Sequence, residues 1–259
     1  MKNLKSKQNS RNHQSKFLKK GILIFALLSF INVSAQNIID IIYVAADGVT
    51  NDIKKAKSFI IVKEYPNYYE RIDYAKAGPL FKSSSYKDTG LTILHGNYYE
   101  YRPDGTILYA GNYKDNKKSE YWLTYNNAGV VIQSEKYEDG TLVEKVAPNK
   151  KDSSKVYGDE REPEFPGGNS AWDRYIAINL KKNKTAKSLA NGGTVTVNFM
   201  IGVDGLVREA FITKSVEYTL DENALEIIKQ SPKWKAAWQN GHAVSSYRRQ
   251  SFTYPANKK

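Results

Sequence analysis

Residues Gly192 to Trp234, GGTVTVNFMIGVDGLVREAFITKSVEYTLDENALEIIKQSPKW, decide the fold of the C-terminal part of the chain. Apolar side chains at every second position from Val195 to Ile201 give the period of two that is typical of a half-buried strand. Asp204 and Gly205 then supply the backbone angles of a hairpin turn. A return strand is predicted from Leu206 to Thr213.

A helix is predicted after this hairpin. Ala224, Leu225 and Ile228 are spaced as one helical face. Asp221 precedes them, and its carboxylate can accept hydrogen bonds from the free amides of a first turn. Pro232 ends the helix. The stretch therefore predicts a strand, a tight turn, a second strand and a capped helix.

The order and spacing of several short motifs resemble a known family. The motifs are the G-x-V-x-V-x-F-x-x-x-x-D-G-x-V pattern from Gly193, the LDENAL helix start (Leu220 to Leu225), the SPKW helix end (Ser231 to Trp234), the Asn240-Gly241 pair, and FPGG upstream (Phe165 to Gly168). Together they resemble the TonB C-terminal domain. The resemblance implies an α+β domain of two helices and a three-stranded antiparallel sheet.

A last strand is predicted from Val244 to Tyr254, where polar and apolar residues alternate. In the family that the sequence resembles, the C-terminal strand region pairs with an extended segment of an outer-membrane transporter. Carried over by position, the candidate partner-binding residues are Val244, Ser245, Ser246, Tyr247, Arg248, Arg249 and Gln250. An exposed edge offers unpaired amides and carbonyls, and the two arginines can hold an acidic partner. The alternative is a purely structural third strand whose arginines keep the edge soluble.

The net charge of +12 suggests a nucleic-acid binder, but its distribution argues against that class. Seven Lys and Arg precede residue 36 without any Asp or Glu, which leaves +5 for the rest of the chain. They stand before the apolar run Gly21–Ile31 and the small residues Val33 and Ala35, a pattern typical of a cleaved secretory signal. Residues 1–35 are thus predicted to direct export to the periplasm. The alternative is a short inner-membrane anchor.

The sequence repeats itself between the signal and the C-terminal part. Tyr101–Gly105 recurs as Tyr125–Gly129, and Gly111–Asp115 recurs as Glu135–Asp139, both at an offset of 24 residues. Such a period with Tyr, Gly and Asp-Gly at fixed places indicates stacked β-hairpins, and it resembles the MORN-like repeats of bacterial exported proteins. Residues 37–147 are therefore predicted as an all-β repeat domain, 148–163 as a linker and 164–259 as the TonB-like domain.

The repeats are rich in aromatic residues, namely Tyr98, Tyr99, Tyr101, Tyr109, Tyr113, Tyr121, Trp122, Tyr125 and Tyr137. Rings of this kind most simply form the faces of a twisted sheet, where cross-strand aromatic pairs are favourable. The functional alternative is a surface that stacks on a glycan or a peptide, since rings with a polar tip suit wet recognition surfaces.

No pattern of catalytic or metal-binding residues is evident. The chain has no cysteine and three histidines, and none stands at metal-ligand spacing. Nucleophile elbows, phosphate loops and dinucleotide fingerprints are also missing from the sequence. We therefore expect no enzyme, no catalytic residue, no cofactor and no metal site.

Two classes of function remain. The first is a periplasmic TonB-like protein that binds an outer-membrane transporter or another envelope protein by strand addition. If residues 1–35 stay as an anchor, an inner-membrane proton-channel complex joins the partners and the protein could transmit energy for transport. The second is a soluble periplasmic scaffold that holds proteins or glycans without energy transduction. The short linker and the eight prolines of the whole chain favour the second class, because the long proline-rich spacer of TonB is missing.

Overall fold

The computed structural model describes residues 37–146, 160–182 and 192–256. They belong to one compact unit, Ser34–Lys259. The predicted signal segment, residues 1–35, lies outside the described residues, as does most of the predicted linker.

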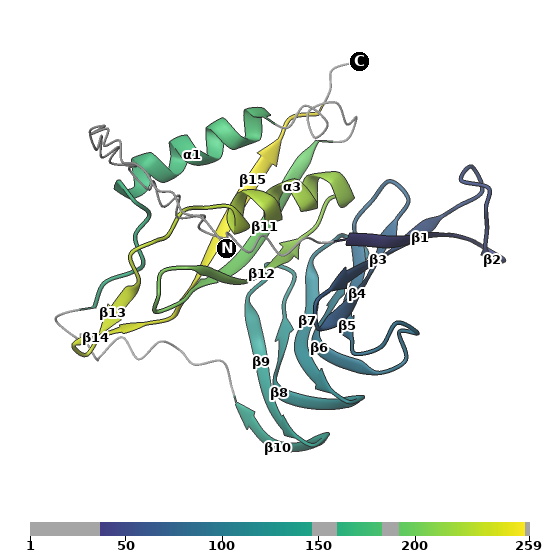
Figure 1. Cartoon of the computed structure of the whole chain (residues 1–259), viewed down its shortest axis with the longest axis horizontal. Coiled ribbons are helices and arrows are strands. Elements are labelled where there is room, and N and C mark those ends of the chain that lie inside the picture. The colour runs from purple at the N-terminus through teal and green to yellow at the C-terminus, as the bar shows by residue number, and fades with distance from the viewer. Residues whose placement is uncertain (1–36, 147–159, 183–191, 257–259) are drawn as a thin grey trace, which may run out of the picture. The chain divides into compact units, whose positions relative to one another are not determined.

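A ten-stranded antiparallel sheet occupies the region of the predicted repeats (Figure 1). Its strands are β1 (Asn37–Ala45), β2 (Gly48–Val49), β3 (Ser58–Tyr65), β4 (Tyr68–Ala75), β5 (Leu80–Tyr86), β6 (Leu94–Tyr101), β7 (Ile107–Lys114), β8 (Lys117–Tyr125), β9 (Val131–Glu138) and β10 (Thr141–Val146). From β3 to β10 each strand pairs with the next along the chain. This arrangement is consistent with the predicted hairpin repeats.

Equivalent positions of neighbouring repeats are tied together. Tyr101 and Tyr125, which the offset of 24 residues relates, are both buried. The guanidinium of Arg102 donates to the carbonyl oxygens of Ile107, at 2.6 Å, and of Tyr125. One arginine thus satisfies carbonyls at the ends of two successive hairpins, which fixes the stacking of one repeat on the next.

The C-terminal part is an α+β fold, as predicted. Its elements are α1 (Gly168–Lys182), β11 (Gly193–Ile201), β12 (Val207–Lys214), α3 (Tyr218–Lys229), β13 (Ala237–Gln239), β14 (His242–Val244) and β15 (Ser246–Tyr254). A three-stranded antiparallel sheet has the order β12-β11-β15, and β13 and β14 form a separate hairpin. The predicted hairpin turn is confirmed, with Gly205 at a φ of 79°.

Every second side chain of β11, from Val195 to Ile201, lies on the buried face of the three-stranded sheet. Val195, Val197, Phe199 and Ile201 are buried. On their side of the sheet, Phe199 meets Trp172 of α1 and Trp234, whose ring centroids lie 6.4 and 5.9 Å away. This aromatic core explains the Trp of the SPKW motif, since packing against the sheet fixes the chain after α3.

The sequence-based assignment of Asp221 as the helix cap is wrong. The carboxylate of Glu217 caps α3, accepting from the Leu220 amide at 2.9 Å. The helix therefore begins one turn earlier than predicted. Asp221 lies inside α3 and is fully buried. Its carboxylate accepts hydrogen bonds from Tyr74, Ser215 and Val216 instead of from the first turn of the helix.

The predicted strand from Val244 to Tyr254 is divided. Val244 pairs with Ala237 in the β13–β14 hairpin, whose turn is Asn240-Gly241, and β15 begins only at Ser246. Part of the predicted linker also pairs: Arg161 forms an antiparallel bridge with Trp238. The boundaries predicted for the domains stay predictions.

The large sheet and the C-terminal part share one hydrophobic core. The buried hydroxyl of Tyr101 donates to the carbonyl oxygen of Ile212 on β12 at 2.9 Å. The Asp104-Gly105 turn lies against the residue after β12, since the Ser215 amide donates to the Gly105 carbonyl at 2.8 Å. A Cβ on Gly105 would lie 2.3 Å from the Ser215 carbonyl oxygen, so only glycine allows this contact.

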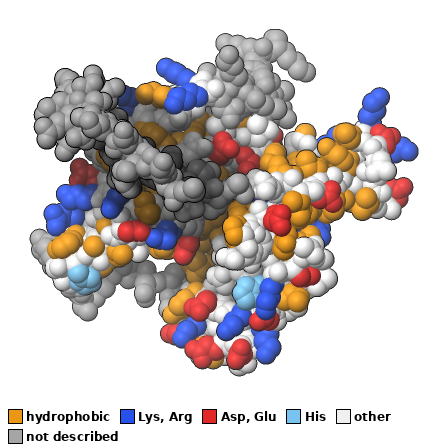
Figure 2. Space-filling view, in the orientation of Figure 1, with side chains coloured by type: hydrophobic (Ala, Val, Ile, Leu, Met, Phe, Trp, Pro, Cys, Tyr) orange, Lys and Arg blue, Asp and Glu red, His pale blue; other side chains and the backbone are white. Residues whose placement is uncertain are grey.

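The first strand of the large sheet exposes apolar side chains. Ile38, Ile39 and Ile41 are each about half exposed, and Figure 2 shows apolar side chains gathered on the arm that Figure 1 labels β1. Only Val44 and Ala45 pair with β2, so the other edge positions of β1 have no neighbouring strand among the described residues.

Candidate functional site: the free edge of the small sheet

The outer edge of β15 is the clearest candidate site in the C-terminal part. β15 pairs with β11 alone among the strands that the structure describes. The pairing runs in unbroken register from Gly193 with Tyr254 to Ile201 with Ser246. A regular ladder leaves a regular row of amides and carbonyls on the outer side, which can template a further strand.

The opposite edge of this sheet is partly covered. Lys214, the last residue of β12, forms a bridge with Thr106, and its ammonium donates to the Asp104 carbonyl oxygen at 2.6 Å. The turn between β6 and β7 therefore occupies the C-terminal end of the β12 edge. β12 is also interrupted by register shifts against β11. Of the two edges, β15 offers the longer and more regular one.

The seven predicted partner-binding residues do not lie on one strand. Val244 belongs to β14, Ser245 lies between the strands, and Ser246, Tyr247, Arg248, Arg249 and Gln250 begin β15. The first two were grouped with the rest because the alternation of polar and apolar residues passes through them without a break. Only the β13–β14 hairpin, in which Val244 pairs with Ala237, separates them.

The two arginines point to opposite faces of the sheet. The Arg248 guanidinium lies 5.5 Å from the Trp234 ring centroid and donates to the Pro163 carbonyl oxygen at 2.8 Å. The Arg249 guanidinium approaches the carbonyl oxygen of Ala128, in the turn before β9, at 3.4 Å. Both arginines thus have partners within the chain, and the backbone of β15 is the stronger recognition element.

A buried carboxylate joins the large sheet to the C-terminal part, and sequence reasoning missed it. Asp221 accepts from the hydroxyls of Tyr74 on β4, at 3.0 Å, and Ser215, at 2.5 Å, and from the Val216 amide at 3.1 Å. Ser215 in turn accepts from the Leu80 amide at 2.8 Å. Burial raises the pKa of Asp221 from 3.8 to about 7, although the three donors favour the ionised form. The only signal in the sequence is an acidic residue three and four positions before Ala224 and Leu225, on the apolar side of the predicted helix.

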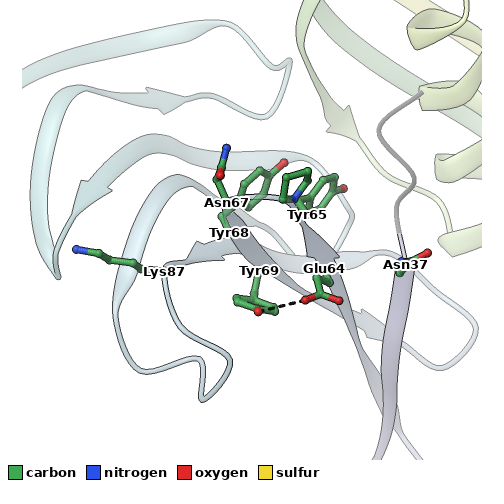
Figure 3. A pocket seen from close by; sticks show the side chains of 8 residues that line it. Asn37, Glu64, Tyr65, Asn67, Tyr68, Tyr69 and Lys87 are labelled. Carbon is green, nitrogen blue, oxygen red and sulfur yellow. Dashed lines mark hydrogen bonds between the residues drawn. The ribbon is translucent and has the colours of Figure 1, made fainter. Parts of the chain in front are cut away.

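A shallow pocket of about 420 Å³ lies at the β3–β4 turn (Figure 3). The rings of Tyr65 and Tyr68 stack on each other there, with centroids 4.4 Å apart, and Tyr69 donates to Glu64 at 3.2 Å. Lys87 points away from these rings in Figure 3, and its ammonium pairs with Asp115 at 3.0 Å. The Tyr65 and Tyr69 hydroxyls donate to the carboxylates of Glu70 and Glu64, so this arrangement serves the hairpin itself.

Two searches of the described residues gave no candidates. No group of three His, Cys, Asp or Glu side chains could hold a metal ion in residues 37–146, 160–182 and 192–256. Within the same ranges, no helix is long and apolar enough to cross a membrane.

Comparison with known proteins gives one match. No curated protein and no solved structure matches the chain. The segment from residue 184 to residue 255 contains β11, β12, α3, β13, β14 and the whole of β15. Residues 184–255 match the family model of the Gram-negative bacterial TonB protein C-terminal, so this segment is similar to the C-terminal domain of TonB.

Proposed function

We propose that the protein works in the periplasm as a binding protein, and that the outer edge of β15 adds a strand from an outer-membrane transporter or another envelope protein. The observation that carries the proposal is the unbroken nine-residue ladder of β15 on β11, with its outer side unpaired in the described part of the chain. Main-chain hydrogen bonds supply the affinity in this mode of recognition, and alternate side chains supply the specificity. The work is binding and not catalysis.

Proline substitution can block this edge. In an antiparallel strand, neighbouring amides point to opposite edges, so one of Arg249 and Gln250 points its N–H outward. Of Arg249→Pro and Gln250→Pro, one breaks a bond to β11 and is expected to cost about 3 kcal/mol. The other removes an outward donor together with the side-chain contact to Ala128 (Arg249) or Trp172 (Gln250), so its thermal midpoint should match that of the corresponding alanine variant.

We expect the stable proline variant to capture detergent-extracted outer-membrane proteins at least about tenfold less than wild type, by quantitative mass spectrometry. Arg249→Ala and Gln250→Ala are the matched controls, because they remove the same side chains and keep the amides. Capture equal to wild type by a stable proline variant would show that the edge is not the binding surface.

The form of the mature chain separates two versions of this function. We expect the exported protein to begin at Gln36, because the apolar run Gly21–Ile31 is shorter than the roughly 20 residues that a membrane span needs. Mass spectrometry of the N-terminal peptide measures this directly. A start at Gln36 supports a soluble scaffold without energy transduction. Retention of residues 1–35 contradicts it and supports an anchored transducer that contacts an inner-membrane proton-channel complex.

A further inference from the structure

A cleft of about 640 Å³ lies between the ten-stranded sheet and the three-stranded sheet. β6 to β9 line one side, and β11, β12 and β15 line the other. Its volume falls within the range of about 300–1,000 Å³ that is usual for ligand sites. Apart from Tyr247, which is also on β15, its lining is distinct from the strand edge proposed above.

Two glutamates enter this cleft from bulges in different sheets. Glu120 has a φ of 59° and Glu209 a φ of 48°, in the left-handed region that non-glycine residues seldom adopt. The β7–β8 register shifts between Ala110 and Asn112, opposite Glu120. The β11–β12 register shifts likewise next to Glu209. Bulges re-aim side chains, and strained backbone of this kind collects at functional sites.

An unsatisfied amide lies opposite the second bulge. Asn198 pairs with Phe211 on β12 and lines the same cleft. Its Oδ1 is the only buried side-chain oxygen or nitrogen in the described residues that has no hydrogen-bond partner. Buried polar groups are otherwise paired almost without exception, so Asn198 leaves an acceptor at the wall of the cleft that a ligand hydroxyl reaches when the side chain turns toward it.

Aromatic rings supply the rest of the lining. Tyr121 and Tyr247 are 48% and 57% exposed, and Tyr247 donates to the Glu209 carboxylate. Deeper in the cleft, Tyr99 and Phe211 stack with centroids 4.9 Å apart. No lysine or arginine is among the described residues that line the cleft, although the Arg249 guanidinium lies next to the lining residue Gly129. Its charged groups are therefore two carboxylates, which repel phosphate, sulfate and uronate groups.

We propose that this cleft binds a neutral oligosaccharide. The apolar face of a sugar ring can pack on the exposed tyrosines. Its hydroxyls can donate to the carboxylates of Glu120 and Glu209 and to Asn198 Oδ1, all of which are acceptors. The ligand is uncharged because the described lining of the cleft holds two carboxylates and no cation that would balance an acidic sugar. Binding here adds a second activity to strand addition and does not depend on it.

Trp122 does not line the cleft and gives no signal for binding there. Its ring packs against Tyr98 and Tyr113, at centroid distances of 5.6 and 5.1 Å. Isothermal titration of the full chain is therefore the suitable measurement. The probes are N-acetylglucosamine, glucose and mannose tetrasaccharides to about 10 mM, which covers weak binding. A galacturonate tetrasaccharide serves as the acidic comparison, and an uncharged tetrapeptide as the peptide comparison.

We expect at least one neutral tetrasaccharide to bind and the galacturonate not to bind. Tyr121→Ala is expected to weaken binding about tenfold, whereas Tyr109→Ala should have no effect. Tyr109 is a 38% exposed tyrosine on the adjacent strand and does not line the cleft. Asn198→Ala should also weaken binding, yet keep its thermal midpoint within about 3 °C, because the Asn198 oxygen loses no partner within the chain.

Three results would overturn the proposal. The first is no heat from any neutral tetrasaccharide. The second is binding that Tyr121→Ala and Asn198→Ala both leave unchanged, which would place the sugar elsewhere. The third is tighter binding of the galacturonate or the tetrapeptide, which would assign the cleft to another class of ligand. Tyr247 is left unchanged in these variants so that the β15 edge stays intact. A negative result for oligosaccharide binding therefore does not count against strand addition at that edge.

Discussion

Replacing Gly205 by alanine is expected to lower the free energy of unfolding by about 3–5 kcal/mol. This is a large effect for a substitution that adds one methyl group. Gly205 has a φ of 79°, and a Cβ built on it lies 2.0 Å from the carbonyl oxygen of Trp234. The Trp234 amide donates to the Gly205 carbonyl at 2.8 Å. The methyl group therefore forces the hairpin turn and Trp234 apart, and Trp234 is a buried member of the aromatic core.

Gly241→Ala provides the control for this prediction. Gly241 has nearly the same φ, 78°, but a Cβ there meets nothing within 4 Å. Its substitution should cost only the left-handed backbone, about 1–2 kcal/mol. Urea unfolding measures the free energy of unfolding of both variants. The difference between the two values gives the cost of the close contact between the methyl group added at Gly205 and Trp234. Equal destabilisation of the two variants would mean that the Gly205 turn does not press on Trp234.

The buried carboxylate of Asp221 is expected to make stability depend on pH. Its pKa is 3.8 in a solvated chain and about 7 in the folded protein, since burial disfavours the charged form. Between these values the folded state binds more protons than the unfolded state. The stabilisation that protonated Asp221 gives the folded state is therefore fully present below about pH 4, and it is lost as the pH rises through 7. The free energy of unfolding should fall by up to about 4 kcal/mol over this range.

Asp221→Asn should remove this slope, because the amide keeps the shape and cannot ionise. Asp173→Asn, at an exposed position of α1, is the matched control and should keep the wild-type slope. Asp104 and Asp204 have lowered pKa values through hydrogen bonds to the Thr106 and Leu206 amides, so they act in the opposite direction but below pH 4. Urea titrations at pH 4, 6 and 8 measure the effect. Identical slopes for wild type and Asp221→Asn would contradict the assignment.

Local pattern was sufficient to predict the elements but not their partners. The return strand is predicted at Leu206–Thr213 and observed at Val207–Lys214, because the turn before it marks where it begins. The Asp204-Gly205 turn was predicted by the same short-range chemistry. That Gly205 also meets Trp234 depends on residues 29 positions apart in the chain, for which a single sequence carries no signal.

The candidate sites show the same limit. The strand edge was predicted from a resemblance, and its first two residues were misplaced because alternation cannot show where one strand pairing ends and another begins. The cleft was not predicted. Its glutamates lie in β-bulges, where an extra residue shifts the side-chain alternation, and such an insertion becomes visible only when both strands are paired. Asn198 looked like an ordinary polar position of a half-buried strand.

The way the large sheet is joined to the C-terminal part has an evolutionary consequence. The hydrogen bonds described between them involve Tyr74, Leu80, Tyr101, the Asp104–Thr106 turn and Ala128, which lie away from both ends of the sheet. β10 at one end and β2 at the other make none of them. A lineage can therefore gain or lose a terminal hairpin by duplication or deletion of one repeat while the shared core and the cleft stay intact. Among related chains, the sheet should vary in length at its ends and stay constant where Tyr101 meets β12.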